Sequence, residues 1–306
     1  MNVYIILKNT DNSEMIYDNI LSFSFHKDSY QSYTSLGAKF QGNISVPENV
    51  SEIILKIDGK TVHHGIADNI SVEFTGGNSV ISLSSRSFTS LLLQNQIETG
   101  LKTNISINSL INSYYNLPYV THEDNQETSY IFVKSNSNMW DGIVNLSYKI
   151  KGTYPYIRGT NYIRITPVEN PEVFEYNDDN LISRGVTTSG RKLTSNFHMS
   201  DLNGDFGEYE LSDSDIISHN IIRHRFFELD RQFLYNPQQA LEYRSAYSSR
   251  GRKINFCTYS GYNGEDLSDI ITFGNVDKKR INSVTITGNS SGIITETAVY
   301  TDKFFT

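Results

Sequence analysis

Carboxylate and cysteine side chains are the first groups in this sequence that could do chemistry. Paired carboxyl groups hydrolyse glycosidic bonds when they stand about 5–10 Å apart in a cleft lined by aromatic rings. The chain has 34 Asp and Glu residues, so pairs arise by chance and no pair is distinguished by its surroundings. Cys257 stands in a strand-like stretch, where we expect a buried small side chain and not a nucleophile. We therefore expect no catalytic residues, no cofactor and no enzyme.

Two pairs of histidines are the next candidates, as metal ligands. His63 and His64 are adjacent, and His219 and His224 are five residues apart. Within a strand, residues at odd spacing point to opposite faces of the sheet. Neither pair would then hold one metal ion, and no HExxH pattern is present. We expect structural roles for all four histidines.

An acidic stretch, residues 201–215, begins like a calcium-binding loop. An EF-hand loop requires glycine at its sixth position and glutamate at its twelfth. Those positions are occupied by Phe206 and Ser212, so we interpret the stretch as a solvated loop. The alternative is a weak divalent-cation site, whose ligands would be Asp201, Asn203, Asp205 and Glu208.

Two further features allow a structural and a functional interpretation. Trp140 lies on an apolar helical stripe, so we expect it in a core and not as a platform for sugar binding. Basic side chains cluster locally from Arg244 to Lys253. We interpret this cluster as a solvated helix end. The alternative is the positively charged lining of a channel, or a salt-bridge partner for an acidic neighbour.

The first 85 or so residues are predicted to be strands and turns, and a short helical face starts at Phe88. Residues 20–25 alternate apolar and serine side chains, as a half-buried strand does. The dipeptide Asp58-Gly59 is a strong hairpin signal, because glycine adopts positive φ without a steric cost. Further strands are expected at residues 38–46, 53–57, 66–74 and 80–84. Short strands at this spacing predict a small antiparallel barrel or sandwich.

Residues 96–168 predict a compact α/β unit. A helix is expected over residues 107–115, with Ser106 as its N-cap. A strand at residues 130–133 and a second helix over residues 139–151 follow, and Gly152 stands where a C-cap glycine belongs. A hairpin over residues 154–165 completes the unit.

Residues 169–306 return to sheet. We expect residues 181–188 to pair with residues 192–199. Residues 216–227 are β-branched and aromatic, which favours sheet. Residues 237–249 predict a short helix that begins near a proline. Residues 281–300 predict a hairpin that resembles the hairpin at residues 70–84. The fold class is therefore mainly β, of the α+β kind.

Composition and charge exclude several classes of protein. The chain is 306 residues long with a net charge of −8, which disfavours a free-standing nucleic-acid binder. One cysteine excludes an intrachain disulfide scaffold. No apolar run approaches the roughly 20 residues that span a bilayer, so we expect no membrane insertion by this chain. The first residues show no secretory signal.

Three segments resemble the baseplate hub of contractile phage tails and phage-tail-like bacteriocins, the late control protein D type. Residues 56–74 are similar to that family's strand, glycine-containing return and second strand. Residues 80–92 are similar to its strand that ends in an Arg-Ser pair and opens a helix with a leucine pair. Residues 132–152 are similar to its strand, helix and glycine before a hairpin.

The resemblance implies a fold of two tube-type antiparallel β-barrels, residues 1–95 and 169–306, with an inserted small α/β domain, residues 96–168. It implies a homotrimer, a symmetry adaptor that joins a hexameric tail tube to a trimeric spike. Tail tube protein, spike protein, tape-measure protein and other baseplate proteins are the implied partners. We expect assembly in a bacterial cytoplasm as part of a virion or tail-like particle.

Two rival interpretations remain. One is a cell-wall hydrolase or a glycan- or receptor-binding tail protein. The other is an unrelated all-β binding module. Duplicated barrels would separate the hub from the second rival, and converging carboxylates in a deep cleft would support the first.

Overall fold

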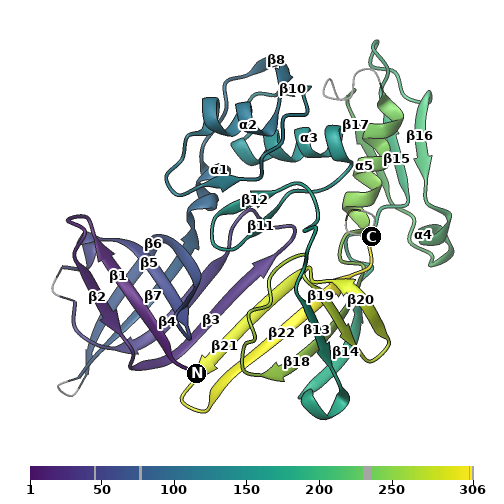
Figure 1. The fold of residues 1–306 in the computed structure, drawn as a ribbon. Coiled ribbons are helices and arrows are strands. Elements are labelled where there is room, and N and C mark those ends of the chain that lie inside the picture. The colour runs from purple at the N-terminus through teal and green to yellow at the C-terminus, as the bar shows by residue number, and fades with distance from the viewer. Residues whose placement is uncertain (45, 76–77, 230–235, 303, 305–306) are drawn as a thin grey trace.

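The computed structural model describes residues 1–306 except 45, 76–77, 230–235, 303 and 305–306. The protein is mostly β, as the sequence predicts, with one large curled antiparallel sheet and a few short helices (Figure 1). A mixed unit and a separate small sheet lie above the large sheet in this view. Within the described part of the chain, no helix is long and apolar enough to cross a membrane.

The large sheet contains eleven strands in the order β14-β18-β22-β21-β3-β4-β7-β6-β5-β1-β2. Seven come from the beginning of the chain: β1 (Val3–Asn9), β2 (Glu14–Tyr17), β3 (Ile20–Asp28), β4 (Ser35–Gln41), β5 (Val50–Ile57), β6 (Lys60–Thr75) and β7 (Asn78–Ser87). Four come from its last third: β14 (Ser183–Thr188), β18 (Lys253–Ser260), β21 (Ser283–Asn289) and β22 (Gly292–Tyr300).

Alternation along the strands fixes which face of the sheet is buried. In β4, Leu36, Ala38 and Phe40 are buried, whereas the residues between them are more exposed. The two sets of strands meet where β3 pairs antiparallel with β21, and Phe25 stands opposite Ile286. One hydrophobic core continues across this junction from the first strands to the last. The predicted hairpin at residues 281–300 is therefore confirmed as β21 and β22.

The middle of the chain contains both helices and strands. Its helices are α1 (Leu91–Gln94), α2 (Ile107–Leu110), which continues into a π-helical turn (Ile111–Tyr115), and α3 (Met139–Lys151). Its strands are β8 (Gly100–Ile105), β9 (Thr121–His122), β10 (Ser129–Val133), β11 (Tyr156–Arg158) and β12 (Tyr162–Arg164). The buried side chains of this unit form a second core, in which Trp140 is packed.

Two smaller sheets complete the fold. The first joins β13 (Val173–Tyr176), β19 (Ile270–Phe273) and β20 (Val276–Arg280), and packs against the core of the large sheet. The second has the order β16-β15-β17 and contains β15 (Asn196–Met199), β16 (Tyr209–Ser212) and β17 (His224–Phe227). Helix α5 (Pro237–Ser249) packs on β15 and β16, and α4 (Ser214–Ser218) follows β16. Short 3₁₀ turns occur at Pro47–Asn49, Phe88–Ser90 and Asp178–Asn180.

Two sequence expectations in the last third are wrong. Residues 181–188 do not pair with residues 192–199, because β14 pairs with β18 and β15 pairs with β16 and β17. Residues 216–227 are not one strand, because their beginning lies in α4. Asp213 caps that helix by accepting hydrogen bonds from Asp215 N and Ile216 N. This local cap outweighs the β propensity of the isoleucines that follow.

Candidate functional site: a basic groove

A groove of about 680 Å³ opens between α3, the segment before β15, strand β17 and helix α5. Among the described residues that line it, six are cationic and one, Asp141, is a carboxylate. The six are Arg191, Lys192, Arg223, Arg225, Arg244 and Arg250. We call this site the basic groove. Its charge is opposite in sign to the chain's net charge of −8.

Helix α5 forms one wall of the basic groove. The Asn236 side chain accepts a hydrogen bond from Gln239 N, and Pro237 opens the helix. Ala240 and Leu241 are buried against the small sheet, which fixes the rotation of the helix. Residues 243, 244 and 247 then face the groove, because residues three and four apart share a helix face.

Aromatic rings from both walls contact two of the cations of helix α5 and the residue that follows it. The rings of Tyr243 and Tyr247 are stacked with centroids 6.0 Å apart. The Arg250 guanidinium lies 3.5 Å from the centroid of Tyr247, and Arg250 Nη1 donates to the Tyr247 carbonyl at 2.6 Å. The Arg244 guanidinium lies 4.1 Å from the centroid of Phe227. These cation–π contacts orient the two arginines without neutralising their charge.

Strand β17 supplies the opposite wall. Arg225 and Phe227 both line the basic groove, because residues two apart point to the same face of a sheet. His224 and Phe226 point to the other face, where both rings stack with His198. The strand therefore separates a basic face from an aromatic and histidine-bearing face.

Arg223 holds the mouth of the groove in place. Its Nη1 donates to the carbonyl oxygens of Gly190, Arg191 and Leu193 at 3.0, 2.8 and 3.0 Å. These bonds fold residues 190–193 into a tight loop, which brings Arg191 and Lys192 to the rim. Within the described chain, the side chains of Arg191 and Lys192 take part in no salt bridge, and both are exposed.

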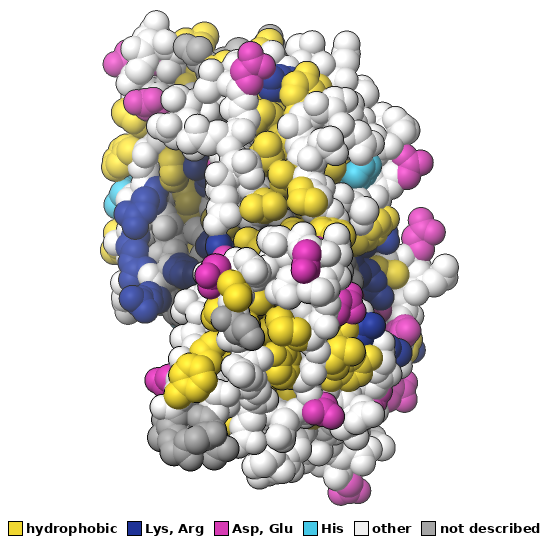
Figure 2. Space-filling model, turned by 90° about the vertical axis from the view of Figure 1, so that its left-hand side faces the viewer, with side chains coloured by type: hydrophobic (Ala, Val, Ile, Leu, Met, Phe, Trp, Pro, Cys, Tyr) yellow, Lys and Arg dark blue, Asp and Glu magenta, His cyan; other side chains and the backbone are white. Residues whose placement is uncertain are grey.

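The six cations of the basic groove come together from three segments of the chain. Figure 2 shows one group of Lys and Arg side chains along one edge of the molecule and others beside Asp and Glu side chains on the opposite side. Because like charges converge in a hollow with low-dielectric walls, such a groove attracts carboxylates or phosphates. The groove is therefore suited to bind an anionic partner.

Sequence reasoning predicted only part of this site. Arg244 and Arg250 belong to the basic cluster of residues 244–253, whereas Arg252 forms an ion pair with Asp215 outside the groove. The other cations were missed because they lie in two short basic segments, residues 191–192 and 223–225, which only the fold brings together. A search of this acidic chain for short segments with two basic residues would have identified residues 191–192 and 223–225.

The structure places the four predicted histidines in structural positions. His63 is fully buried, and His64 Nε2 lies 2.7 Å from Glu52 Oε2. His219 is the C-cap of α4. His224 Nδ1 lies 2.9 Å from His198 Nε2, a pairing that the sequence spacing did not indicate.

The acidic stretch is held in a turn by the side chain of Asp201, which accepts hydrogen bonds from backbone N–H groups of the same stretch. Asp201 Oδ1 accepts hydrogen bonds from Asn203 N at 2.8 Å and from Asp205 N at 2.9 Å. These bonds lower the pKa of Asp201, and the bond from Asp205 N has the largest effect. Within the described residues, no group of three or more His, Cys, Asp or Glu side chains is arranged to hold a metal ion.

Among the described residues, neither Cys257 nor the serine of a G-x-S-x-G sequence is placed as a catalytic nucleophile would be. Cys257 is fully buried, and burial raises the pKa of its thiol to about 11. The spacing G-x-S-x-G occurs once, at residues 288–292, but these residues form the turn between β21 and β22. A hydrolase nucleophile requires this sequence between a strand and a helix.

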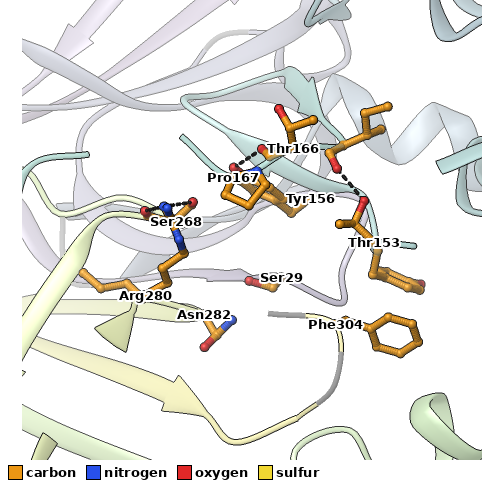
Figure 3. Close-up of a pocket in the computed structure, with 12 residues that line it drawn as sticks. Ser29, Thr153, Tyr156, Thr166, Pro167, Ser268, Arg280, Asn282 and Phe304 are labelled. Atoms are coloured by element: carbon orange, nitrogen blue, oxygen red, sulfur yellow. Dashed lines mark hydrogen bonds between the residues drawn. The ribbon is translucent and has the colours of Figure 1, made fainter. Parts of the chain in front are cut away.

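A smaller cavity of about 100 Å³ lies between the middle unit and the large sheet (Figure 3). Several of its polar groups are hydrogen-bonded to other residues of the lining. Arg280 Nη1 donates to Ser268 O and to Ser268 Oγ at 2.9 Å, and Tyr156 Oη donates to Thr166 O at 2.9 Å. The cavity lies where these packed units meet.

Comparison with known proteins identifies the class of fold. No family model matches the sequence, and no curated protein matches it. Solved structures do match. The 43 kDa tail protein of prophage MuSo2 from Shewanella oneidensis has a TM-score of 0.73 at 14% identity, with 97% of this chain and 98% of that chain covered. The tail protein from Neisseria meningitidis MC58 has a TM-score of 0.76 at 11% identity, with 100% and 98% covered.

A third similar structure is the E. coli c3393 protein, described as a component of the type VI secretion system with structural similarity to the T4 bacteriophage tail proteins gp27 and gp5. Its TM-score is 0.60 at 8% identity, with 93% of this chain and 74% of that chain covered. The chain therefore has the fold of phage tail proteins and of related type VI secretion components, along nearly its whole length.

Proposed function

We propose that this chain is a structural, non-enzymatic baseplate hub of a contractile tail or tail-like bacteriocin. As a homotrimer, it joins a hexameric tail tube to a trimeric spike and contacts tape-measure and other baseplate proteins. The observation that carries the proposal is the fold similarity to two tail proteins over 98% of their length. Such a hub is assembled in the bacterial cytoplasm and resides in the baseplate of the particle.

The division of the large sheet supports the symmetry role. We propose that residues 1–95 and residues 169–306 form two related tube-type units, and that residues 96–168 are the inserted α/β unit. Strands β3 and β21 join the two units in one sheet. Three chains with two related units each would present six similar surfaces to a hexameric tube.

The free edges of the sheet suit contacts between proteins. Strands β2 and β14 are its two edge strands. Ile16 on β2 is 65% exposed and Val186 on β14 is 55% exposed. Monomeric proteins usually protect such edges with charges or by covering them. These edges are therefore proposed as contact sites in the assembled ring.

The test is the mass and shape of the purified full chain. Light scattering should give three times the 34.8 kDa of one chain, and negative-stain micrographs should show a ring with a central lumen. Ile16→Lys on the edge strand should weaken the trimer. Leu101→Lys is the matched control, because Leu101 is 61% exposed on β8, away from both sheet edges. A chain that stays monomeric at high concentration would contradict the proposal.

A further inference from the structure

The basic groove lacks a described partner that matches its charge. Within the described chain, Arg191, Lys192, Arg225 and Arg250 form no salt bridge, although acidic residues outnumber basic residues by 34 to 26. Apolar surface lines the same groove, from Val144, Leu193, Phe197 and Phe227. A complementary occupant would carry carboxylates and exposed apolar side chains together.

One segment of this chain has that composition. Residues 201–208, which we call the acidic loop, contain Asp201, Asp205 and Glu208. In the same loop Leu202 is 82% exposed and Phe206 is 49% exposed. Asp201 N donates to Asp205 O at 2.8 Å, so the loop is folded before it meets a partner. A folded loop loses little conformational entropy on binding.

The acidic loop of one chain cannot enter the basic groove of the same chain. Strands β15 and β17 are parallel, and Phe197 on β15 and Arg225 and Phe227 on β17 line the groove. The acidic loop follows the end of β15 at Met199. The ring of Phe206 packs edge-on against Phe226, on the face of β17 opposite to Arg225 and Phe227.

We propose that the basic groove receives the acidic loop of a second copy of this chain. Groove and loop lie on opposite faces of the small sheet, so the contact joins two different surfaces and is head-to-tail. A head-to-tail contact closes into a ring when its rotation is a fraction of a full turn. This inference rests on the proposed trimer and identifies one contact that holds it together.

The test exchanges charges across the contact in the full chain. The groove variant carries Lys192→Glu and Arg225→Glu, and the loop variant carries Asp205→Lys and Glu208→Lys. Each alone should weaken self-association at least tenfold in sedimentation experiments. The protein with all four substitutions should recover most of the association, because opposite charges face one another again. Added salt should weaken the wild-type assembly.

The control reverses the same number of charges elsewhere. Lys39→Glu with Lys60→Glu changes two exposed lysines of the large sheet, and should leave association within twofold of wild type. Circular dichroism melts of all variants establish that each is folded. None of the groove residues changed here makes the hydrogen bonds that hold the rim, which belong to Arg223.

Four outcomes overturn the inference. A trimer that tolerates the groove and loop variants would refute this contact while the proposed hub trimer stands. Failure of the four-fold variant to recover would show that the two surfaces do not face one another. A single-stranded DNA oligonucleotide that binds wild type but not the groove variant, in chains that assemble equally well, would make nucleic acid the occupant. A wild type that is monomeric refutes the trimer itself.

Discussion

At the scale of single residues, His63 shows how the sheet tolerates a titratable group in its interior. Its Nδ1 lies 2.9 Å from Thr34 Oγ1 and its Nε2 lies 2.8 Å from Ser85 Oγ, so both ring nitrogens have partners. Hydroxyl groups serve a neutral imidazole as donor and as acceptor. Burial, followed by the charges of His64 and Lys27, lowers the pKa of His63 to about 3.

This lowered pKa predicts a loss of stability in acid. The unfolded chain binds a proton at this histidine below about pH 6.5, whereas the native chain does so only near pH 3. Stability is therefore fully present above pH 6.5 and decreases as the pH falls toward 3, by on the order of 4 kcal/mol from this group. Urea denaturation from pH 7 to pH 4 should show a smaller decrease for His63→Gln than for wild type.

The control for this effect is His219→Gln, because His219 is exposed at the end of α4. It should keep the wild-type slope of stability against pH. Equal slopes for His63→Gln and wild type would contradict the assignment of the acid sensitivity to His63.

At the scale of elements, helix α3 is specified by its own ends. The Asn138 side chain accepts a hydrogen bond from Asp141 N at 2.8 Å, and Asp141 Oδ2 accepts one from Asn138 N at 3.1 Å. Gly152 ends the helix with φ of 70°, a left-handed conformation that glycine adopts without strain. Both ends are local, so the helix can form before its surroundings do.

Removal of the N-terminal cap should destabilise the protein modestly. Asn138→Ala leaves Asp141 N without its partner and should lower the free energy of unfolding by about 1 kcal/mol in urea titrations at pH 7. Asn138→Ser should retain most of the stability, since serine is also a good N-cap. Equal losses for both variants would show that the side chain acts through packing and not through capping.

These local signals explain what the sequence predicted well. The bounds of α3 at residues 139–151 and of α5 at residues 237–249 follow from their caps and periodicity, and both predictions are confirmed. The helix expected over residues 107–115 is confirmed only in part, because its second half is a π-helical turn. Capping determines where a helix starts and stops but not its hydrogen-bond period.

Non-local pairing explains what the sequence did not predict. Strand β14 pairs with β18, some seventy residues further along the chain, and not with the strand that follows it. The basic groove depends on the same kind of information, because Arg191, Arg225 and Arg250 come from three distant segments. The alternation of apolar and polar residues predicts that a segment is a strand, but it does not predict which other strand will pair with it.

At the scale of the whole molecule, the large sheet joins the two ends of the chain in one core. Ile286 on β21 is fully buried, and the same core contains Ile53 and Leu55 on β5. A core that is continuous in this way should unfold as one cooperative unit. The two proposed tube-type units are then related in form but not independent in stability.

A substitution at the junction tests this cooperativity. Ile286→Ala should cost about 2–5 kcal/mol, and native-state hydrogen exchange should show that the most protected amides of β5 and β22 lose protection equally. Ile294→Ala is the control, because Ile294 is 44% exposed on the same hairpin and should cost less than about 1 kcal/mol. Amides of β5 that keep their protection in Ile286→Ala would show two independent units.

The pairing of β3 with β21 also sets an order of events during synthesis. His26 on β3 lies against Thr285 on β21, 259 residues later in the chain. Until the ribosome has made the last strands, β3 carries an unpaired edge that another chain could bind. The nascent polypeptide therefore cannot complete its sheet in stages, and the ring proposed above could form only after its last strands have been made.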